Sequence, residues 1–235
     1  MLEIKNLSKS YVIDKKAVND VNISIEDGEI FAFIGHNGAG KTTVIKCICG
    51  ILDFEEGEIL INGKSIKKEP ISCKKEIAYI PDNPDLYEAL TGIQYLNFIG
   101  DIYLIEKEQR NKDIIYFSEL FSIKNNLNDM ISTYSHGMKQ KLAIISAFIR
   151  HPKLMLLDEP FVGLDPKAAY LMKEEMKKLC ENGTSIFFST HVLEVAEKLC
   201  DHVAIIKDGE IIASGTMSDV KGDKSLEAVF LELEG

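Results

Sequence analysis

One octapeptide limits what this chain can fold into more than any other part of the sequence. Gly35-His36-Asn37-Gly38-Ala39-Gly40-Lys41-Thr42 fits the pattern G-x-x-x-x-G-K-[ST]. It follows the apolar run 30–34, which reads as a strand, and it leads into a segment with helical spacing. A strand, a glycine loop and a helix in this order form a cradle in which backbone amides bind phosphate groups. The sequence therefore predicts an α/β fold with a phosphate-binding loop.

The residues of this loop have different expected roles. The glycines let the backbone turn its amides toward the phosphates, and the N-terminus of the following helix adds a favourable dipole. Lys41 is expected to hold the β- and γ-phosphates, and the Thr42 hydroxyl is expected to ligate Mg²⁺. The alternative is a plain glycine-rich turn, which the flanking strand and helix disfavour. The predicted nucleotide-binding residues of this segment are Gly35, His36, Asn37, Gly38, Ala39, Gly40, Lys41, Thr42 and Thr43.

A pair of carboxylates forms a second candidate site. The apolar run 154–157 ends abruptly in Asp158 and Glu159, which places them at the edge where open α/β sheets bind ligands. Asp158 is expected to help hold Mg²⁺, and Glu159 to orient or deprotonate an attacking water. Two acids after a strand would by themselves more often be a solvated turn. The phosphate loop upstream reverses that preference.

The rest of the chain alternates short apolar runs with helical stretches, which is typical of a mainly parallel sheet covered by helices. The block 84–150 is different because it contains helices and no clear strand. We therefore expect one domain over residues 1–235, with an α/β core formed by 1–83 and 151–235 and an inserted helical lobe at 84–150. The expected strands are 21–25, 29–34, 58–61, 77–80, 154–157, 185–189 and 203–206. The expected helices are 42–49, 92–105, 107–121, 138–149, 167–181 and 193–199.

Composition excludes several classes of protein. Hydrophobic residues make up 46% of the chain, enough for a sizeable core. No apolar run approaches the roughly 20 residues that span a bilayer, and residues 1–10 do not resemble a secretion signal. The formal net charge of -10 disfavours nucleic acid as a partner. The five cysteines are odd in number and contain no C-x-x-C pair, so we expect buried, reduced thiols in the cytoplasm.

A third segment makes the sequence specific to one family. Tyr134-Ser135-His136-Gly137-Met138-Lys139-Gln140 resembles the signature segment of the ATP-binding-cassette (ABC) ATPases, and it precedes Asp158 by an interval typical of that family. Ser135, the Gly137 amide and the start of a helix would form a second anion-binding surface. The resemblance implies that this surface faces ATP held by an opposite subunit. An ordinary Ser-capped helix is the simpler alternative, and the flanking motifs disfavour it.

Three further positions fit motifs of the same family. Tyr11 stands where the family stacks an aromatic ring on adenine, although a single tyrosine in such a segment is more often strand packing. Asp165, in Gly163-Leu164-Asp165-Pro166, resembles the loop that communicates between paired subunits, and its alternative is a proline-marked helix start. His191 resembles the histidine that contacts the γ-phosphate and positions water, whereas a lone histidine is more often structural.

Two positions depart from the family pattern. In Tyr79-Ile80-Pro81-Asp82, a carboxylate stands where the family often has Gln. Asp82 can still accept a hydrogen bond from a metal-bound water, so it is assigned to both the nucleotide and the metal set. His136 replaces the first of two signature glycines, as exporter-type cassettes often do. The resemblance thus assigns Glu159 and His191 to catalysis and Thr42, Asp158 and Asp82 to the metal.

The resemblance covers essentially the whole chain, and the ending 225–230 is similar to cassettes of drug, antibiotic-resistance and ion exporters. It implies a P-loop NTPase fold with a mainly parallel core sheet, an N-terminal antiparallel β subdomain and an inserted helical lobe. It also implies an ATPase that uses ATP and Mg²⁺ and couples hydrolysis to solute export. The implied partners are a transmembrane permease and a second cassette, in a homodimer or heterodimer. The chain would then lie on the cytoplasmic face of the cell membrane, held there by the permease.

Three other functions remain to be weighed. A soluble ABC ATPase acting in translation or on DNA would usually have two cassettes or long coiled coils, and neither is visible. A small-molecule phosphotransferase would leave the segment 135–140 and His191 unexplained. A non-catalytic binding module would be expected to lack Lys41 or Glu159, and both are present.

Overall fold

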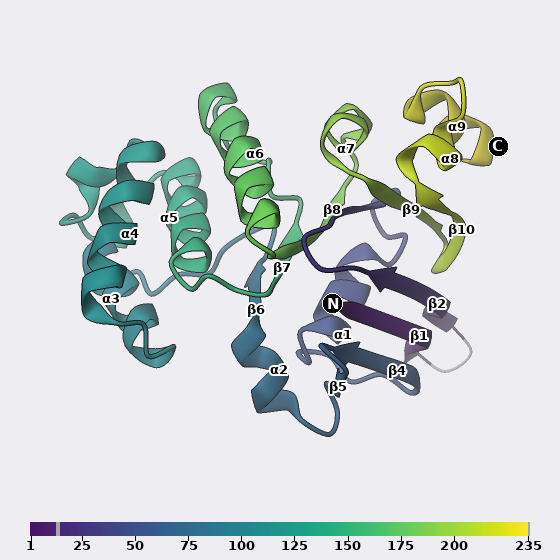
Figure 1. The fold of residues 1–235 in the computed structure, drawn as a ribbon, viewed down its shortest axis with the longest axis horizontal. Helices are drawn as coiled ribbons and strands as arrows, with labels where there is room; N and C mark the ends of the chain where they lie inside the picture. The colour runs from purple at the N-terminus through teal and green to yellow at the C-terminus, as the bar shows by residue number, and fades with distance from the viewer. Residues whose placement is uncertain (13–14, 235) are drawn as a thin grey trace.

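An antiparallel sheet forms the N-terminal part of the computed structural model, which describes residues 1–12 and 15–234. Its strands lie in the order β2-β1-β4-β5. The bounds are Leu2–Val12 for β1, Lys15–Ile25 for β2, Glu56–Ile61 for β4 and Lys64–Ser65 for β5. This sheet is the antiparallel β subdomain that the family resemblance implied, and in Figure 1 it lies beside the helix α1, Lys41–Ile48.

A second sheet of six strands has the order β10-β9-β3-β8-β7-β6. All neighbouring strands are parallel except the terminal pair β9 and β10, which confirms a mainly parallel sheet. Since parallel strands point the same way, their carboxyl ends share one edge, and that edge can gather residues from distant parts of the chain. The strands are β3 Ile30–Ile34, β6 Ile77–Ile80, β7 Leu154–Asp158, β8 Ser185–Thr190, β9 His202–Lys207 and β10 Glu210–Thr216.

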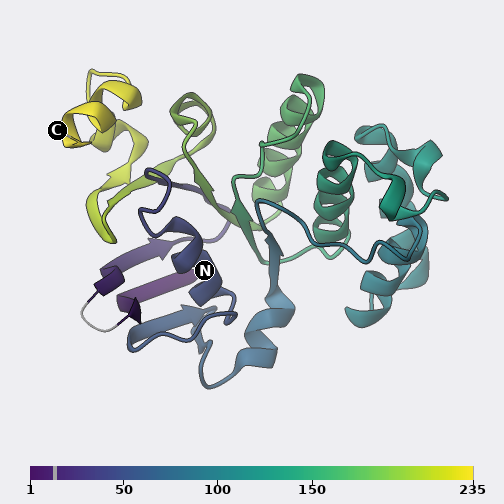
Figure 2. The same ribbon diagram turned by 180° about the vertical axis from the view of Figure 1, so that it is seen from behind.

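The helices form two groups. The first lies between β6 and β7 in sequence and occupies one end of the molecule in both views (Figures 1 and 2). It contains α3 Gly92–Ile102, α4 Lys107–Leu120 and α5 His136–Phe148, with the 3-10 turns η1 Lys124–Asn126 and η2 Ile131–Thr133. The others are α1, α2 Pro70–Glu76, α6 Pro166–Glu181, α7 Leu193–Leu199, α8 Met217–Lys221 and α9 Leu226–Glu234.

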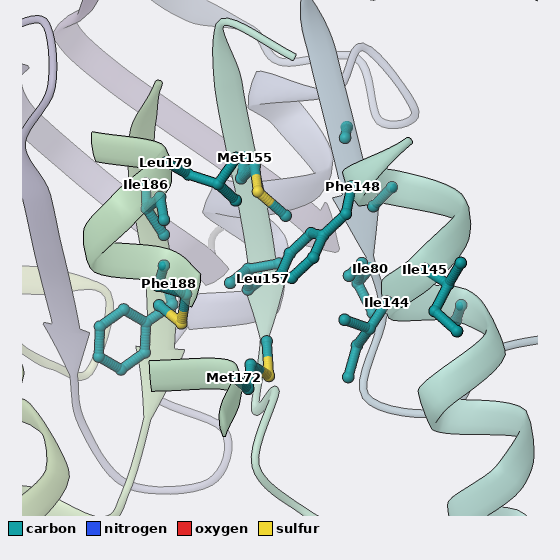
Figure 3. Packing of buried hydrophobic residues seen from close by; sticks show 14 of the residues in the cluster. Ile80, Ile144, Ile145, Phe148, Met155, Leu157, Met172, Leu179, Ile186 and Phe188 are labelled. Atoms are coloured by element: carbon teal, nitrogen blue, oxygen red, sulfur yellow. The ribbon is translucent and has the colours of Figure 1, made fainter. Parts of the chain in front are cut away.

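The six-stranded sheet is buried on both faces. Side chains of a strand alternate between faces, so Met155 and Leu157 of β7 pack into one hydrophobic cluster and Leu154 and Leu156 into another. Figure 3 shows Met155 and Leu157 with Phe148 of α5 and with side chains of α6. The opposite cluster joins the sheet to α1 and the antiparallel strands. Burial on both faces explains why these strands read as continuous apolar runs.

The thiols behave as the sequence predicted. Cys47, Cys49, Cys73 and Cys200 are buried, Cys180 is half-buried, and all five are free thiols within the described residues. Burial raises the pKa of Cys47 to about 11 and that of Cys180 to about 12. These groups therefore remain protonated and chemically quiet at neutral pH.

Several elements escaped the sequence patterns. The helix expected over 92–105 ends at Ile102, because Leu104 adopts a left-handed backbone with φ 55°. Strand β10 is half-exposed along its length, so it has no apolar run to reveal it. Helices α2, α8 and α9 are short and lie outside the helical stretches that periodicity predicted. Among the helices of the described ranges, none combines the length and apolarity needed to span a bilayer.

Candidate functional site

A cavity of about 400 Å³ lies at the carboxyl edge of the six-stranded sheet. Its walls come from β1 and β2, from the loop between β3 and α1 with the start of α1, and from the residues that follow β6 and end β7. Most of the residues that the sequence nominated for nucleotide or metal binding meet here, although they come from four separate parts of the chain. The lining residues are Tyr11, Ala17, His36, Asn37, Gly38, Gly40, Lys41, Thr42, Thr43, Asp82, Asp158 and Glu159.

The loop between β3 and α1 is held in an open turn by its glycines. Gly38 and Gly40 have φ values of 87° and 113°, a region that favours glycine. A Cβ on Gly40 would also lie 2.7 Å from the carbonyl oxygen of Ala17, too close for any side chain. Gly35 and Ala39 belong to the same turn but do not line the cavity.

Lys41 is the first residue of α1, and its ammonium group folds back to contact the backbone of the loop. Nζ donates hydrogen bonds to the carbonyl oxygens of Gly35 at 2.5 Å and His36 at 3.0 Å. Burial lowers the pKa of Lys41, and the nearby carboxylates of Glu159 and Asp158 partly offset that effect. A buried cation beside exposed backbone amides is a strong anion site, since little water competes for it.

Asp158 is buried and uses both carboxylate oxygens. Thr42 Oγ1 donates to Oδ2 at 2.7 Å, and Ser189 Oγ donates to Oδ1 at 2.5 Å. The register of the sheet explains the second bond, because Asp158 of β7 pairs directly with Ser189 of β8. Thr42 and Asp158 thus place a hydroxyl and a carboxylate oxygen side by side, and hard oxygen atoms are the ligands that Mg²⁺ prefers.

Glu159 follows the last residue of β7 and turns back over the sheet edge. Its backbone has φ 49°, and its amide donates to the carbonyl oxygen of Ser189 at 3.2 Å. Its Oε1 lies 2.9 Å from Nδ1 of His191 and 3.9 Å from Nζ of Lys41. A non-glycine residue in this backbone region is uncommon and usually held by its surroundings. The carboxylate is therefore fixed between a histidine and the phosphate loop.

Two nominated residues lie at the rim of the cavity. The Tyr11 ring is exposed, and its hydroxyl lies 3.2 Å from Oγ1 of Thr43. Because the ring is not packed in a strand interface, it presents a face on which a flat base could stack. Asp82 is also exposed, and its Oδ1 accepts a hydrogen bond from the Asn83 amide at 2.9 Å.

The remaining nominated residues form a second surface away from the cavity. Ser135 is the N-cap of α5 and accepts from the Met138 amide at 3.3 Å, and Asp165 is the N-cap of α6. Asp165 also pairs with Lys141 of α5 at 2.7 Å, which lowers the pKa of its carboxyl. A Cβ on Gly137 would lie 2.9 Å from the carbonyl oxygen of Gly163. The segment 134–140 and the loop 163–166 thus pack closely together.

Sequence reasoning missed one residue that lines the cavity, Ala17, and one that holds a lining residue in place, Ser189. Ser189 orients Asp158, but it is one of three hydroxyl residues in β8, and nothing in the sequence distinguishes it from the other two. Ala17 lines the cavity through a strand that has no distinctive sequence feature.

Comparison with known proteins identifies this arrangement. The family model described as "ABC transporter" matches residues 18–162, more than half of the chain. The chain belongs to the ABC transporter family. It is an ATP-binding cassette of that family and an ATPase, as the sequence predicted.

Individual relatives agree with this assignment. The cassette is 36% identical to the ABC-type transporter ATP-binding protein EcsA of Bacillus subtilis, over 99% of this chain and 96% of that protein. It is also 36% identical to the linearmycin resistance ATP-binding protein LnrL of the same organism, over 94% and 70% of the two chains.

Solved structures show the same fold. An ATP-binding subunit of an ABC transporter superimposes with a TM-score of 0.96 at 35% identity, covering 100% of both chains. The dimeric cassette MJ0796, in a post-hydrolysis state bound to ADP and Pi, gives a TM-score of 0.84 at 25% identity over 92% of this chain and 99% of that one. The cassette therefore has the ABC ATPase fold that the sequence predicted.

Proposed function

We propose that the cavity binds ATP and that its residues, together with His191, carry out hydrolysis. The observation that carries this proposal is the meeting of Lys41, the Thr42–Asp158 pair and the Glu159–His191 pair at one sheet edge. Lys41 and the amides of Gly38 and Gly40 bind the phosphates, and the Tyr11 ring stacks on the adenine.

The metal site is formed by Thr42 and Asp158. The 2.7 Å hydrogen bond between them joins two hard oxygen donors, and these fit the ligand preference of Mg²⁺. A bound Mg²⁺ would neutralise charge on the phosphates. Ser189 holds the far oxygen of Asp158, so it fixes the direction of the carboxylate. Asp82, at the rim, serves as an outer acceptor for metal-bound water.

Glu159 is the general base. Its Oε1 accepts the proton of the attacking water, and Nδ1 of His191 orients this oxygen from 2.9 Å. Lys41 Nζ lies 3.9 Å from the same oxygen, which places the carboxylate close to the proposed phosphate position. These contacts of Glu159 support the assignment of the cassette as a hydrolase and not as a module that only binds nucleotide.

A second cassette completes the site. Ser135 and Gly137 lie at the start of α5, outside the cavity of their own chain, so their amides and hydroxyl are available to ATP on an opposite cassette. Asp165 lies beside the same surface, because its carboxylate pairs with Lys141 of α5. A dimeric state of a similar cassette supports this proposal. Closure around two ATP molecules and reopening after hydrolysis would then move attached membrane subunits.

Loss of the Ser135 hydroxyl should weaken this paired state. We expect Ser135→Ala to lower ATP-dependent dimerisation and ATPase activity by at least about tenfold, because a hydrogen bond to a charged phosphate is removed. Size-exclusion chromatography with ATP and phosphate release would measure the two effects.

The structure offers a matched control for that variant. Thr91 caps α3 with a hydrogen bond from the Gln94 amide of the same length, 3.3 Å. Thr91→Ala removes a cap of equal kind, worth about 1 kcal/mol, without touching the proposed ATP surface. An equal loss of dimerisation in the two variants would contradict the assignment of Ser135.

We further propose that residues 84–150 act as a helical lobe on the core 1–83 and 151–235, within one domain. The helical group α3–α5, inserted between β6 and β7, supports these boundaries. The cassette would lie at the cytoplasmic face of the cell membrane, bound to a separate permease that carries solute outward. The name of LnrL, a resistance protein, supports export.

Copurification tests the transporter assignment. The chain would be isolated with its native partners from detergent-solubilised membranes and assayed for Mg²⁺-dependent ATPase activity. A multispanning partner in an active complex is the expected result. Recovery only with ribosomes or DNA would instead favour a soluble ABC ATPase.

A further inference from the structure

The C-terminal helix α9 contacts the phosphate loop, and neither the fold nor the proposed chemistry requires this contact. The ring of Phe230 lies 5.2 Å from the ring of His36, centroid to centroid, at an interplanar angle of 67°. This is the edge-to-face arrangement that aromatic rings favour. His36 lies in the loop and lines the nucleotide cavity, whereas Phe230 is nearly 200 positions away in sequence.

The position of Phe230 is set by the core and not by the loop. Helix α9 packs its apolar residues 226, 229, 230 and 233 against the core, the spacing of one helical face. Leu226 is fully buried, and its amide donates to Glu197 Oε2 of α7 at 3.1 Å. At the other end, Lys207 Nζ of β9 donates to the carbonyl oxygen of Leu233 at 3.3 Å. Both ends of α9 are thus tied to the body of the cassette, beside α7 and α8 (Figure 1).

His36 carries the contact into the site. Its carbonyl oxygen accepts a hydrogen bond from Lys41 Nζ at 3.0 Å and another from the Ala39 amide at 3.1 Å. Phe230 packs against one side of the exposed His36 ring, and His36 belongs to a glycine-rich turn. Restraining this ring restrains the backbone of the phosphate loop at His36, whose carbonyl oxygen takes part in both hydrogen bonds.

Helix α9 also reaches the other half of the site. Its anchor Glu197 belongs to α7, which begins two residues after His191. One short helix therefore rests on both the phosphate loop and the helix that follows the proposed catalytic histidine.

We propose that Phe230 is a positioning residue for nucleotide binding, which holds His36 so that the phosphate loop keeps its binding conformation. The proposal rests on the assignment of the cavity to ATP. Because an aromatic pair contributes about 0.5–1.5 kcal/mol, removing it should weaken MgATP binding by roughly two- to tenfold and no more. The effect should fall on Kd and KM, with kcat at saturating ATP nearly unchanged, because bound ATP itself orders the loop.

The test uses the full-length chain, with MgATP titrated in a calorimeter and ATPase activity measured in parallel. Phe230→Ala is expected to raise Kd by the stated factor. Phe230→Leu keeps an apolar side chain of similar size and so preserves the packing of α9, but it lacks the ring and should also raise Kd. Phe230→Tyr keeps the ring and should restore wild-type affinity. Leu231→Ala, at the exposed neighbouring position, is the matched control and should bind MgATP like the wild type.

A double-mutant cycle with His36→Ala tests the route of the effect. If Phe230 acts through His36, Phe230→Ala should have no further effect on Kd once His36 is replaced. An equal loss in both backgrounds would overturn the proposal, as would wild-type affinity in Phe230→Leu. If the unmodified chain failed to bind MgATP, the proposed function would fall and this inference with it. Normal binding by the unmodified chain with unchanged affinity in Phe230→Ala and Phe230→Leu would refute this inference alone.

Discussion

Replacing Glu159 with Gln is expected to slow ATP hydrolysis by about 10²- to 10⁴-fold while leaving the affinity for MgATP close to that of the wild type. Gln has the shape of Glu and keeps an oxygen for His191 Nδ1, which lies 2.9 Å from Oε1. It cannot accept the proton of the attacking water. Single-turnover phosphate release would measure the chemical step, and calorimetry would measure binding.

The control for this variant is Glu194→Gln, the same chemical change at an exposed position of α7, three residues after His191. Its turnover should match that of the wild type. Since Glu159 has a left-handed backbone, a folding defect should also be checked by thermal melting. Unchanged turnover in a well-folded Glu159→Gln protein would remove Glu159 from the catalytic role.

Replacing Lys41 is expected to act on binding itself. Lys41→Ala should weaken MgATP binding by roughly 10- to 100-fold, because charge-assisted hydrogen bonds to phosphate contribute about 1.5–3 kcal/mol each. The ammonium group is buried in the loop, where its interactions with the carbonyl oxygens of Gly35 and His36 would be replaced by phosphate oxygens. Calorimetric titration gives the affinity directly.

Two variants separate charge from packing at this position. Lys41→Met keeps most of the buried volume without the charge and should lose affinity like Lys41→Ala. Lys46→Ala removes a lysine from the opposite end of α1 and should leave affinity unchanged. Wild-type affinity in Lys41→Met would show that the ammonium group does not hold the phosphates.

The strands of the six-stranded sheet were the most predictable part of the fold. The strand expected at 77–80 is β6, Ile77–Ile80, and the run 154–157 lies within β7. These segments are buried on both faces, so every residue must be apolar and the pattern is hard to miss. Strand β10 is half-exposed and interrupted by small polar residues, so its sequence carries no such mark.

The candidate site was predictable where its parts are local. Gly38, Gly40 and Lys41 lie within one turn. The positive φ values of the loop require the two glycines, and the motif places Lys41 at the first position of the following helix. The bond between Thr42 and Asp158 spans 116 positions, and the sequence suggested that the two residues would meet because both follow strands whose carboxyl ends share one sheet edge. The role of Ser189 depends on which strand lies beside β7, so sequence reasoning could not find it.

By itself, the sequence determined the family, the mainly parallel sheet and the phosphate loop, because periodicity and local motifs depend on residues close together in the chain. Only the tertiary structure decided that Ser189 holds Asp158, that Asp165 pairs with Lys141, and that Phe230 packs on His36. The reason is physical. A sequence pattern records that a side chain must be buried or paired, but the partner is chosen by strand order and helix packing across the whole chain.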